Sequence, residues 1–369
     1  IYKLLNVTLI ERGESFYNPL LADIVSTLKE KELAVESNGA QVVYLEGYKN
    51  RAGESLPLMI SKSDGGFLYA TTDLAAVRHR VVEEKADRIL YVTDAGQSQH
   101  FQMVFDTART AGWINNHMEL KHVPFGVVQG EDGQKLKSRS GETVKLKDLL
   151  FESIRLVDKD MKSRKQTIIS TTIETEKKKK NDDDNIDSNS DSDIELTEEE
   201  EQAVLAVAIG AVKYADLSMN RESDYRFSYS KMLALTGNTA PYMLYAYARI
   251  QGIRRRGEEQ LKETGDSLHS SYVQTVMFSL DTPEEMMLAR TLLRVEDVLR
   301  DVESSLYPNK ICEYLFDLSQ KFNQFYEQCP VLRAETKELQ RSRTALCSIT
   351  ADTLSVCLGL LGIRTVEKL

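Results

Sequence analysis

The sequence has few cysteines and no long apolar run. Its four cysteines all lie in the last third of the 369 residues, at spacings that match neither a zinc site nor a CxxC pair; they are Cys312, Cys329, Cys347 and Cys357. A reduced intracellular chain is the simplest interpretation. No apolar run approaches the ~18 residues of a membrane span, and no signal-like segment opens the chain. We therefore expect a cytoplasmic protein with no membrane partner and no protein-bound metal.

The negative charge is concentrated in one stretch. The formal net charge of the chain is -10 at pH 7. Residues 174–201 hold 13 acidic residues and 4 lysines, so this window alone has a net charge of -9. Because the rest of the chain is close to neutral, the acidic total does not exclude a nucleic-acid partner.

Length and patterning divide the chain into three parts. Residues 1–161 have mixed α/β patterning, and residues 198–369 have nearly continuous helical patterning. Between them, residues 162–197 contain KKKKNDDDNIDSNSDSD, which has too few apolar side chains to offset the entropy cost of ordering. This composition predicts a disordered acidic insertion. Ile1 already stands in a stretch patterned like the inside of a domain, so we expect a longer parent protein.

The first part predicts the second half of a Rossmann-type, doubly wound parallel sheet. LYVTD at 90–94 and FGVVQ at 125–129 are short apolar runs that predict buried strands. A helix is predicted from His100 to Gly112, and an earlier one over about 72–85. In such sheets ligands lie beyond the carboxyl ends of the strands. We therefore expect the TDAGQSQH segment and the loop after residue 129 to meet at one crevice.

The last part predicts an α-helical bundle of five or more helices. Thr197 followed by Glu200 is the pattern of a capping box at a helix start. Pro241 suits the first position of another helix. Further helices are predicted from PEEMMLARTLLRVEDVLRDVE at 283–303 and LCSITADTLSVCLGLLGI at 346–363.

Four side chains near the predicted crevice are candidates for ligand contact. If a helix begins near Tyr69, the phenol and the carboxylate of Asp73 share one face, where a cationic group could meet both. The same spacing also fits a first turn whose aspartate favours the helix dipole. Gln97 follows a predicted strand, and His100 begins the next helix, where it could face a phosphate. Each of these two also has an ordinary structural interpretation.

The stretch GQKLKSRSGETVKL is the most basic loop of the chain. Lys135, Lys137 and Arg139 alternate with other residues between two glycines, an arrangement that suits a polyphosphate. It is not a Walker loop, because the order G-x-x-x-x-G-K-[ST] is absent. A solvated basic hairpin is an equally open interpretation.

One predicted helix combines aromatic and basic side chains, the two types needed for stacking on bases and contacting phosphates. The candidates in PYMLYAYARIQGIRRR are Tyr242, Tyr245, Arg249 and Arg254. A tyrosine-rich helix in a bundle is also typical of a core whose hydroxyls reach the edge.

Together these stretches resemble the carboxyl-terminal two thirds of an arginyl-tRNA synthetase of the eukaryotic cytoplasmic type, a class I aminoacyl-tRNA synthetase. The matching segments run almost end to end, and only residues 162–197 fall outside; they include LIERGESFYN, KSDGGFLYATTDLAAV, EEKADRILYVTDAGQSQHFQ, FGVVQGEDGQKLKSRSGETVKL, VKYADLSMNR and GNTAPYMLYAYARIQGI. The resemblance implies ATP-dependent activation of L-arginine and transfer to tRNA(Arg), Mg²⁺ accompanying ATP, a helical anticodon-binding domain, and a monomer.

The resemblance also implies roles for individual residues. Tyr69, Asp73 and Gln97 match family positions around the arginine side chain, and His100 and Gln97 fall near the nucleotide. Lys135, Lys137 and Arg139 fall in the KMSKS-like loop that stabilises the ATP phosphates. This chain departs from the signature, because aligning Gly141 with the glycine after KMSKS places Ser138 at the second lysine. The helix with Tyr242, Tyr245, Arg249 and Arg254 falls in the tRNA-binding part.

The other class I signature, HIGH, does not occur in these 369 residues. We therefore expect this chain alone to be inactive. A second hypothesis is a noncatalytic tRNA-binding or scaffold protein that kept the fold. Retention of Tyr69, Asp73 and Gln97 favours the enzyme, because a pure binding module needs no amino-acid pocket.

Overall fold

A computed structural model describes residues 1–115, 117–130, 133, 144–180, 194–264 and 277–369. The chain forms two compact units, each with its own core. One unit comprises Thr8–Val127, and the other comprises Ile1–Val7 with Val128–Leu369. Among the helices of the described residues, none combines the length and apolarity needed to cross a membrane.

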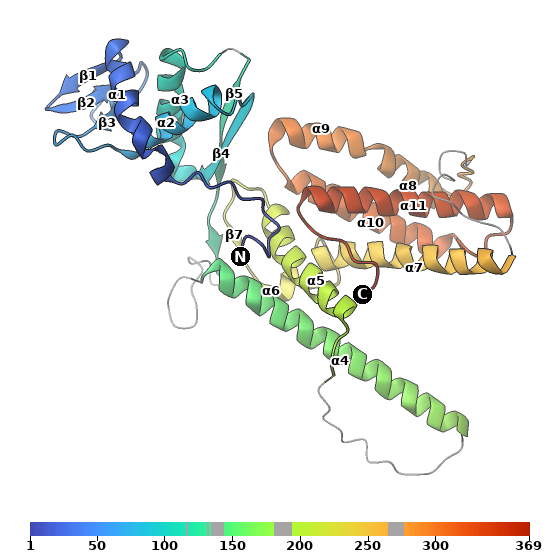
Figure 1. Cartoon of the computed structure of the whole chain (residues 1–369). Coiled ribbons are helices and arrows are strands. Elements are labelled where there is room, and N and C mark those ends of the chain that lie inside the picture. The colour runs from blue at the N-terminus through green and yellow to red at the C-terminus, as the bar shows by residue number, and fades with distance from the viewer. Residues whose placement is uncertain (116, 131–132, 134–143, 181–193, 265–276) are drawn as a thin grey trace. The chain divides into compact units, whose positions relative to one another are not determined.

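The Thr8–Val127 unit contains a parallel strand pair, as its patterning predicts. Strands β4 (Arg88–Asp94) and β5 (Glu119–Phe125) pair in parallel, with η2 (Ala95–Gln97) and α3 (Ser98–Thr110) between them along the chain (Figure 1). The strand predicted at 125–129 is not continuous: Phe125 ends β5, residues 126–127 are in no strand, and Val128–Gln129 form the separate strand β6. β5 lies earlier, because its pairing with β4 in register outweighs the poor strand propensity of ELKHVPF.

The same unit contains an antiparallel sheet that the sequence does not predict. Strands β1 (Ala34–Ser37), β2 (Ala40–Val43) and β3 (Leu58–Ser61) follow one another in that order, next to η1 (Glu14–Leu20) and α1 (Leu21–Glu30). Helix α2 (Tyr69–Val82) then begins three residues earlier than the predicted start. Its buried side chains pack with those of α1 and α3 into one core that includes Ile24, Leu74, Val77 and Val104.

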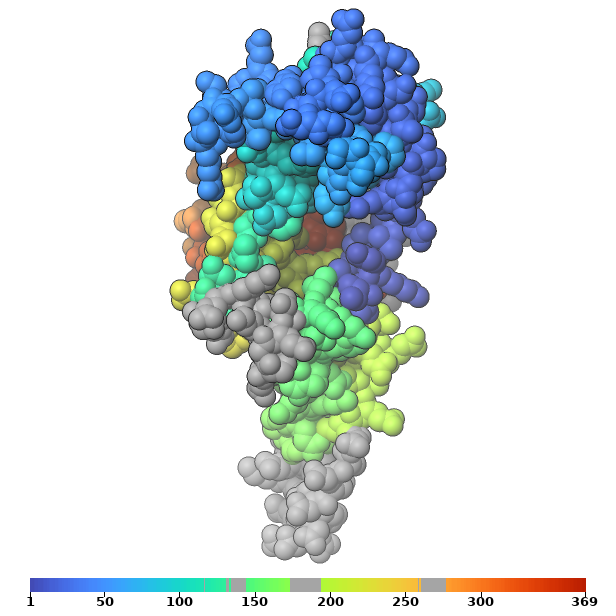
Figure 2. All heavy atoms as spheres, turned by 90° about the vertical axis from the view of Figure 1, so that its left-hand side faces the viewer, coloured from blue at the N-terminus to red at the C-terminus, as the bar shows by residue number. Residues whose placement is uncertain are grey.

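The second unit begins with a short parallel strand pair and two packed helices. β6 (Val128–Gln129) pairs with β7 (Tyr225–Arg226), although nearly a hundred residues separate them. Helices α4 (Leu146–Lys180) and α5 (Glu198–Leu217) pack against each other, and their green and yellow-green spheres lie side by side (Figure 2). α5 begins with the predicted capping box, in which Thr197 Oγ1 accepts from the Glu200 amide. The short helix α6 (Tyr229–Met232) follows β7.

Helix α4 corrects the expectation of disorder for residues 162–180, which are helical. Ion pairs one turn apart support this part of the helix: Lys162 with Asp158 at 3.0 Å and Arg164 with Asp160 at 2.8 Å. Lys165 also bonds Glu200 of α5 at 2.7 Å. These contacts offset the low apolar content of the segment. The domain boundaries at 162 and 198 stay predictions.

The rest of the second unit is the predicted helical bundle. Its helices are α7 (Ala240–Thr264), α8 (Pro283–Leu293), α9 (Val295–Ser305), α10 (Asn309–Gln328) and α11 (Lys337–Leu360) (Figure 1). Residues 283–303, predicted to be helical, form the two helices α8 and α9 with Arg294 between them. Pro241 is the second residue of α7, one position later than predicted.

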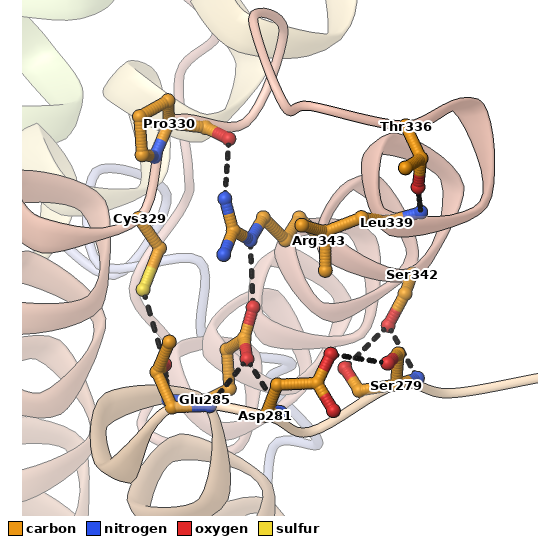
Figure 3. A network of polar contacts seen from close by, with 10 residues as sticks. Ser279, Asp281, Glu285, Cys329, Pro330, Thr336, Leu339, Ser342 and Arg343 are labelled. Carbon is orange, nitrogen blue, oxygen red and sulfur yellow. Dashed lines mark hydrogen bonds and ion pairs between the residues drawn. The ribbon is translucent and has the colours of Figure 1, made fainter.

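A buried ion pair joins α8 to α11 within the bundle (Figure 3). Arg343 Nε donates to Glu285 Oε1 at 2.6 Å, and Arg343 also donates to the Pro330 carbonyl at 2.9 Å. The other carboxylate oxygen of Glu285 accepts from the amides of Asp281 and Thr282. Nearly every polar atom of the pair is therefore satisfied away from water, as buried charges require.

Candidate active site

The site lies near the N-terminal ends of α2 and α3, which bring Asp73 and His100 together. His100 Nε2 lies 2.7 Å from Asp73 Oδ2. Both side chains are partly buried, with 30% of His100 and 28% of Asp73 exposed. The first turn of α2 is held to β3, because the buried Thr71 hydroxyl donates to the Ile60 carbonyl. A fixed carboxylate that reaches solvent on one side can receive a cationic ligand.

Tyr69 lies one turn before Asp73 on the same helix. It is the first residue of α2, and 72% of it is exposed. Because α2 does begin at Tyr69, the spacing of four places the phenol and the carboxylate on one helical face. The dipole interpretation does not describe Asp73 well, because its carboxylate bonds the imidazole of another helix.

Gln97 lies just beyond the carboxyl end of β4, at the N-cap of α3. The loop before it is held by Asp94, whose Oδ1 accepts from the Gly96 amide at 2.8 Å. A side chain on Gly96 would collide with this carboxylate, since an added Cβ would lie 2.8 Å from Oδ1. Gln97 is exposed at the strand end, where parallel sheets bind ligands.

Two residues near the site are not among the candidates predicted from the sequence. The His122 ring of β5 stacks on Phe101 at 5.2 Å, and its Nε2 lies 2.8 Å from Thr93 Oγ1. Tyr91 of β4 accepts a hydrogen bond from Arg80 at 2.6 Å. Burial is the main cause that raises the pKa of Tyr91 to about 12, so its phenol stays neutral at physiological pH. No local pattern in ELKHVPF indicates His122, which the pairing of β5 with β4 brings beside Thr93.

The basic loop can be followed only at its base. Lys135, Lys137, Ser138 and Arg139 lie outside the described residues, so their arrangement stays a prediction. The strand that precedes them is β6, where Gln129 Nε2 donates to Asp224 Oδ2 at 3.1 Å.

Family models match nearly the whole chain. The model described as tRNA synthetases class I (R), catalytic domain, matches residues 1–182 and 156–229, and the DALR anticodon binding domain matches residues 243–369. The chain belongs to the arginyl-tRNA synthetase family. The predicted family is therefore confirmed, as is the predicted order of an α/β catalytic part followed by a helical part.

Curated relatives and solved structures agree with this family. The arginine–tRNA ligase of Cyanothece sp. is 51% identical over 369 residues, and that of Nostoc punctiforme is 50% identical. The chain spans 58% of the length of each relative. The arginyl-tRNA synthetase of Plasmodium falciparum superposes with a TM-score of 0.77 at 31% identity, covering 100% of this chain and 56% of that one. The Thermus thermophilus enzyme, with a TM-score of 0.72 at 21% identity over 100% of this chain and 61% of that one, shows the fold alone.

Helix α7 overlaps the start of the match to the anticodon binding domain. The structure shows the surroundings of the four residues predicted to contact tRNA. Tyr242 packs its ring edge on Phe316. Its hydroxyl accepts from Asn323 at 2.8 Å. Arg249 is exposed, donates to the same Asn323 at 2.7 Å and lies 5.7 Å from the centre of the Tyr326 ring. Tyr242 thus fits the structural interpretation, and Arg249 stands at the surface.

Tyr245 and Arg254 differ in their surroundings. The Tyr245 hydroxyl accepts from Arg164 of α4, and its ring lines a mainly apolar cavity of about 1160 Å³ between α4, α5 and α7. Arg254 is half-buried. The contacts of Tyr245 suffice to explain its place in the fold, so a role in tRNA binding rests on the family pattern alone.

Proposed function

We propose that the protein to which this chain belongs activates L-arginine with ATP and transfers it to tRNA(Arg). The observation that carries the proposal is the Asp73 carboxylate, held by His100 at the top of α2 with Tyr69 one turn away. A planar guanidinium offers paired donors to a carboxylate, and a lysine ammonium cannot reproduce that fork.

The pair suggests how arginine is held. His100 occupies Oδ2 of Asp73, and a guanidinium approaching from the exposed side would find Oδ1 and the remaining lone pair of Oδ2. Tyr69 would cover one face of the guanidinium, and Gln97 would close the strand end. His100 then acts as a positioning residue for arginine, while its predicted nearness to the nucleotide stays a separate prediction.

ATP and its accompanying Mg²⁺ enter as substrate. Among the described residues, no group of three or more His, Cys, Asp or Glu side chains is arranged to hold a metal ion. We assign the triphosphate to Lys135, Lys137, Ser138 and Arg139, whose cations would stabilise the charge developing on the leaving pyrophosphate. Gln97 at the strand end would face the nucleotide side as well.

The helical part would bind tRNA(Arg), with Arg249 and Arg254 as phosphate contacts and Tyr242 and Tyr245 nearby. A cytoplasmic monomer remains part of the proposal. The noncatalytic alternative is a second hypothesis, and the Asp73 carboxylate held by His100 supports the enzyme, because a scaffold needs no such group for a cationic substrate.

Charging of tRNA(Arg) tests the proposal. The intact protein should attach labelled arginine to tRNA(Arg) in the presence of ATP, and lysine should not be attached. The matched control is a tRNA for another amino acid. Binding of tRNA(Arg) without any charging would favour the scaffold alternative.

A further inference from the structure

The segment after α5 contacts the helical bundle through Arg221. Its Nε donates to the Leu306 carbonyl at 3.0 Å, and its guanidinium lies 4.5 Å from the centre of the Tyr307 ring. Only 14% of the Arg221 side chain is exposed. A largely desolvated guanidinium against a carbonyl and an aromatic face is a stronger contact than a surface ion pair.

The neighbouring residue strengthens the same contact. The Tyr307 hydroxyl donates to Glu222 Oε1 at 2.6 Å, and this hydrogen bond is the main reason that the pKa of Tyr307 is raised. Arg221 and Glu222, adjacent in sequence, thus hold Leu306 and Tyr307, which are also adjacent. Two consecutive residues of the segment that leads to β7, Arg221 and Glu222, therefore bind the junction between α9 and α10.

The junction itself has an unusual backbone. Leu306 ends α9 in the left-handed region, with φ at 60°. A branched apolar residue rarely adopts this conformation, and such residues persist where their surroundings hold them. Its amide donates back to Val302 at 2.8 Å, and its carbonyl is the group that Arg221 binds. The contact with Arg221 is thus made to a strained point of the bundle.

The other end of the segment holds β6. A turn closed by Asn220, whose side chain accepts from the Glu222 amide at 3.0 Å, leads to β7. β7 is the strand that pairs with β6 in the described residues, and the Phe227 amide donates to the Gln129 carbonyl at 2.9 Å. A two-stranded pair of this length is not stable by itself. Val128 and Tyr225 pack against the cluster that Phe227 forms with α4 and α5, and the placement of β6 depends on this packing together with what holds β7.

The contact extends one step beyond β6. Gly133 has φ at +74°, and an added Cβ there would lie 3.1 Å from the Arg226 guanidinium. The backbone at Gly133 thus passes close to the side chain of a β7 residue.

We propose that Arg221 and Tyr307 are positioning residues through which the helical bundle fixes β6, the strand that leads to the basic segment. The inference rests on the proposed function, since that function gives the basic segment its role at the triphosphate. The link is made of described contacts from Tyr307 to Arg221, through the 220–224 turn to β7, and from β7 to β6. It assigns to the α9–α10 junction an effect on ATP use without any contact to ATP.

Steady-state kinetics of the intact protein separate positioning from a general loss of folding. Arg221→Ala and Tyr307→Leu should each raise the KM for ATP about fivefold or more in arginine-dependent ATP–pyrophosphate exchange, with the KM for arginine changed less than about twofold. The double variant should be no worse than the more affected single variant, because both changes break one link. Arg300→Ala, which removes an exposed α9 cation paired with Glu296, should leave both KM values unchanged.

A milder substitution at Tyr307 distinguishes the loss of this contact from misfolding. Tyr307→Phe keeps the ring under Arg221 and loses the bond to Glu222, so its effect should lie between those of wild type and Tyr307→Leu. Equal rises in the two KM values, or effects of the two single variants that multiply, would overturn the proposal.

Amide hydrogen exchange tests the connection from Arg221 to β6 without relying on enzymatic activity. In Arg221→Ala, the Phe227 amide, which bonds Gln129, should exchange about tenfold faster than in wild type, and in Arg300→Ala it should not change. Unchanged exchange at Phe227 in Arg221→Ala would overturn the link even if the protein is an active synthetase. An intact wild-type protein that shows no exchange of ATP with pyrophosphate would instead contradict the proposed function.

Discussion

His100 Nε2 lies 2.7 Å from Asp73 Oδ2, although the two residues are 27 positions apart and belong to different helices. The bond fixes the orientation of the carboxylate and leaves its other oxygen for a ligand. With Tyr69 at the start of α2 and Gln97 at the end of the preceding loop, the pair defines the part of the site that would recognise arginine.

Asp73→Ala in the intact protein should raise the KM for arginine strongly and leave the KM for ATP nearly unchanged. Leaving a guanidinium without its carboxylate costs about 3–5 kcal/mol, as for broken buried ion pairs, or at least a hundredfold in affinity. Steady-state exchange kinetics measure both constants. Asp23→Ala, which removes a largely exposed carboxylate paired with Arg78, is the matched control and should change neither. Similar increases for both substrates would argue against Asp73 as the arginine ligand.

His100→Phe keeps an aromatic ring and removes the hydrogen bond to Asp73. Because hydrogen bonds to charged groups contribute about 1.5–3 kcal/mol, we expect the KM for arginine to rise about tenfold or more. The measurement is the same exchange assay with arginine and ATP varied separately. An increase confined to ATP would contradict the positioning role and favour direct contact of His100 with the nucleotide.

Arg343→Met should destabilise the bundle by about 3–5 kcal/mol, because it leaves the Glu285 carboxylate buried without its cation. Denaturant unfolding of the wild type and the variant gives this difference. Arg294→Ala, which removes an exposed partner of Asp317, should cost about 1 kcal/mol or less. A loss for Arg343→Met as small as that for Arg294→Ala would show that the pair contributes little.

The ion pair of Glu285 and Arg343 predicts that the stability of the fold decreases at acid pH. Burial raises the pKa of Glu285, but the hydrogen bonds from Arg343 and the Thr282 amide outweigh it, and the net pKa is below the ordinary value of 4.5. A carboxyl whose folded pKa is lowered stabilises the fold above its unfolded pKa, and this contribution is lost as the pH falls through the folded value. Unfolding measured from pH 7 downward should therefore show stability falling below about pH 4.5. The fall should be weaker in Arg343→Met.

The four thiols should be unreactive in the folded protein. Cys312, Cys329, Cys347 and Cys357 are free and buried, and burial raises the pKa of Cys312 and Cys347 to about 12. The thiolate is the reactive form, so labelling by a thiol reagent at pH 8 should be slow until denaturant is added. Four thiols should then react. Rapid labelling of the native protein would contradict the packing of α10 and α11.

Local signals explain what the sequence predicts well. The Thr197 and Glu200 capping box and the helix that ends before Gly112 each depend on residues within a turn or two. The pairing of Tyr69 with Asp73 on one face follows from the same periodicity. These features could be predicted because helical hydrogen bonds and caps join near neighbours.

Features that the sequence does not predict depend on pairing between residues far apart in the chain. β5 contains Lys121, His122 and Pro124, and only its register with β4 makes it a strand. β6 is defined by Tyr225 and Arg226, which lie far along the chain. The bond between Asp73 and His100 likewise joins two helices whose packing no local pattern reveals. One charge pair with α5, between Lys165 and Glu200, adds to ion pairs within α4 in a segment whose composition alone indicates disorder.

The central claim is that Asp73 belongs to an arginine-specific activating site. The most direct measurement is ATP–pyrophosphate exchange by the intact protein with arginine or lysine as the amino acid. We expect exchange with arginine, none with lysine, and loss of the arginine signal at low arginine concentration in Asp73→Ala. The 369-residue chain by itself should give no exchange. Exchange that proceeds equally with lysine, or that is unaffected in Asp73→Ala, would contradict the account.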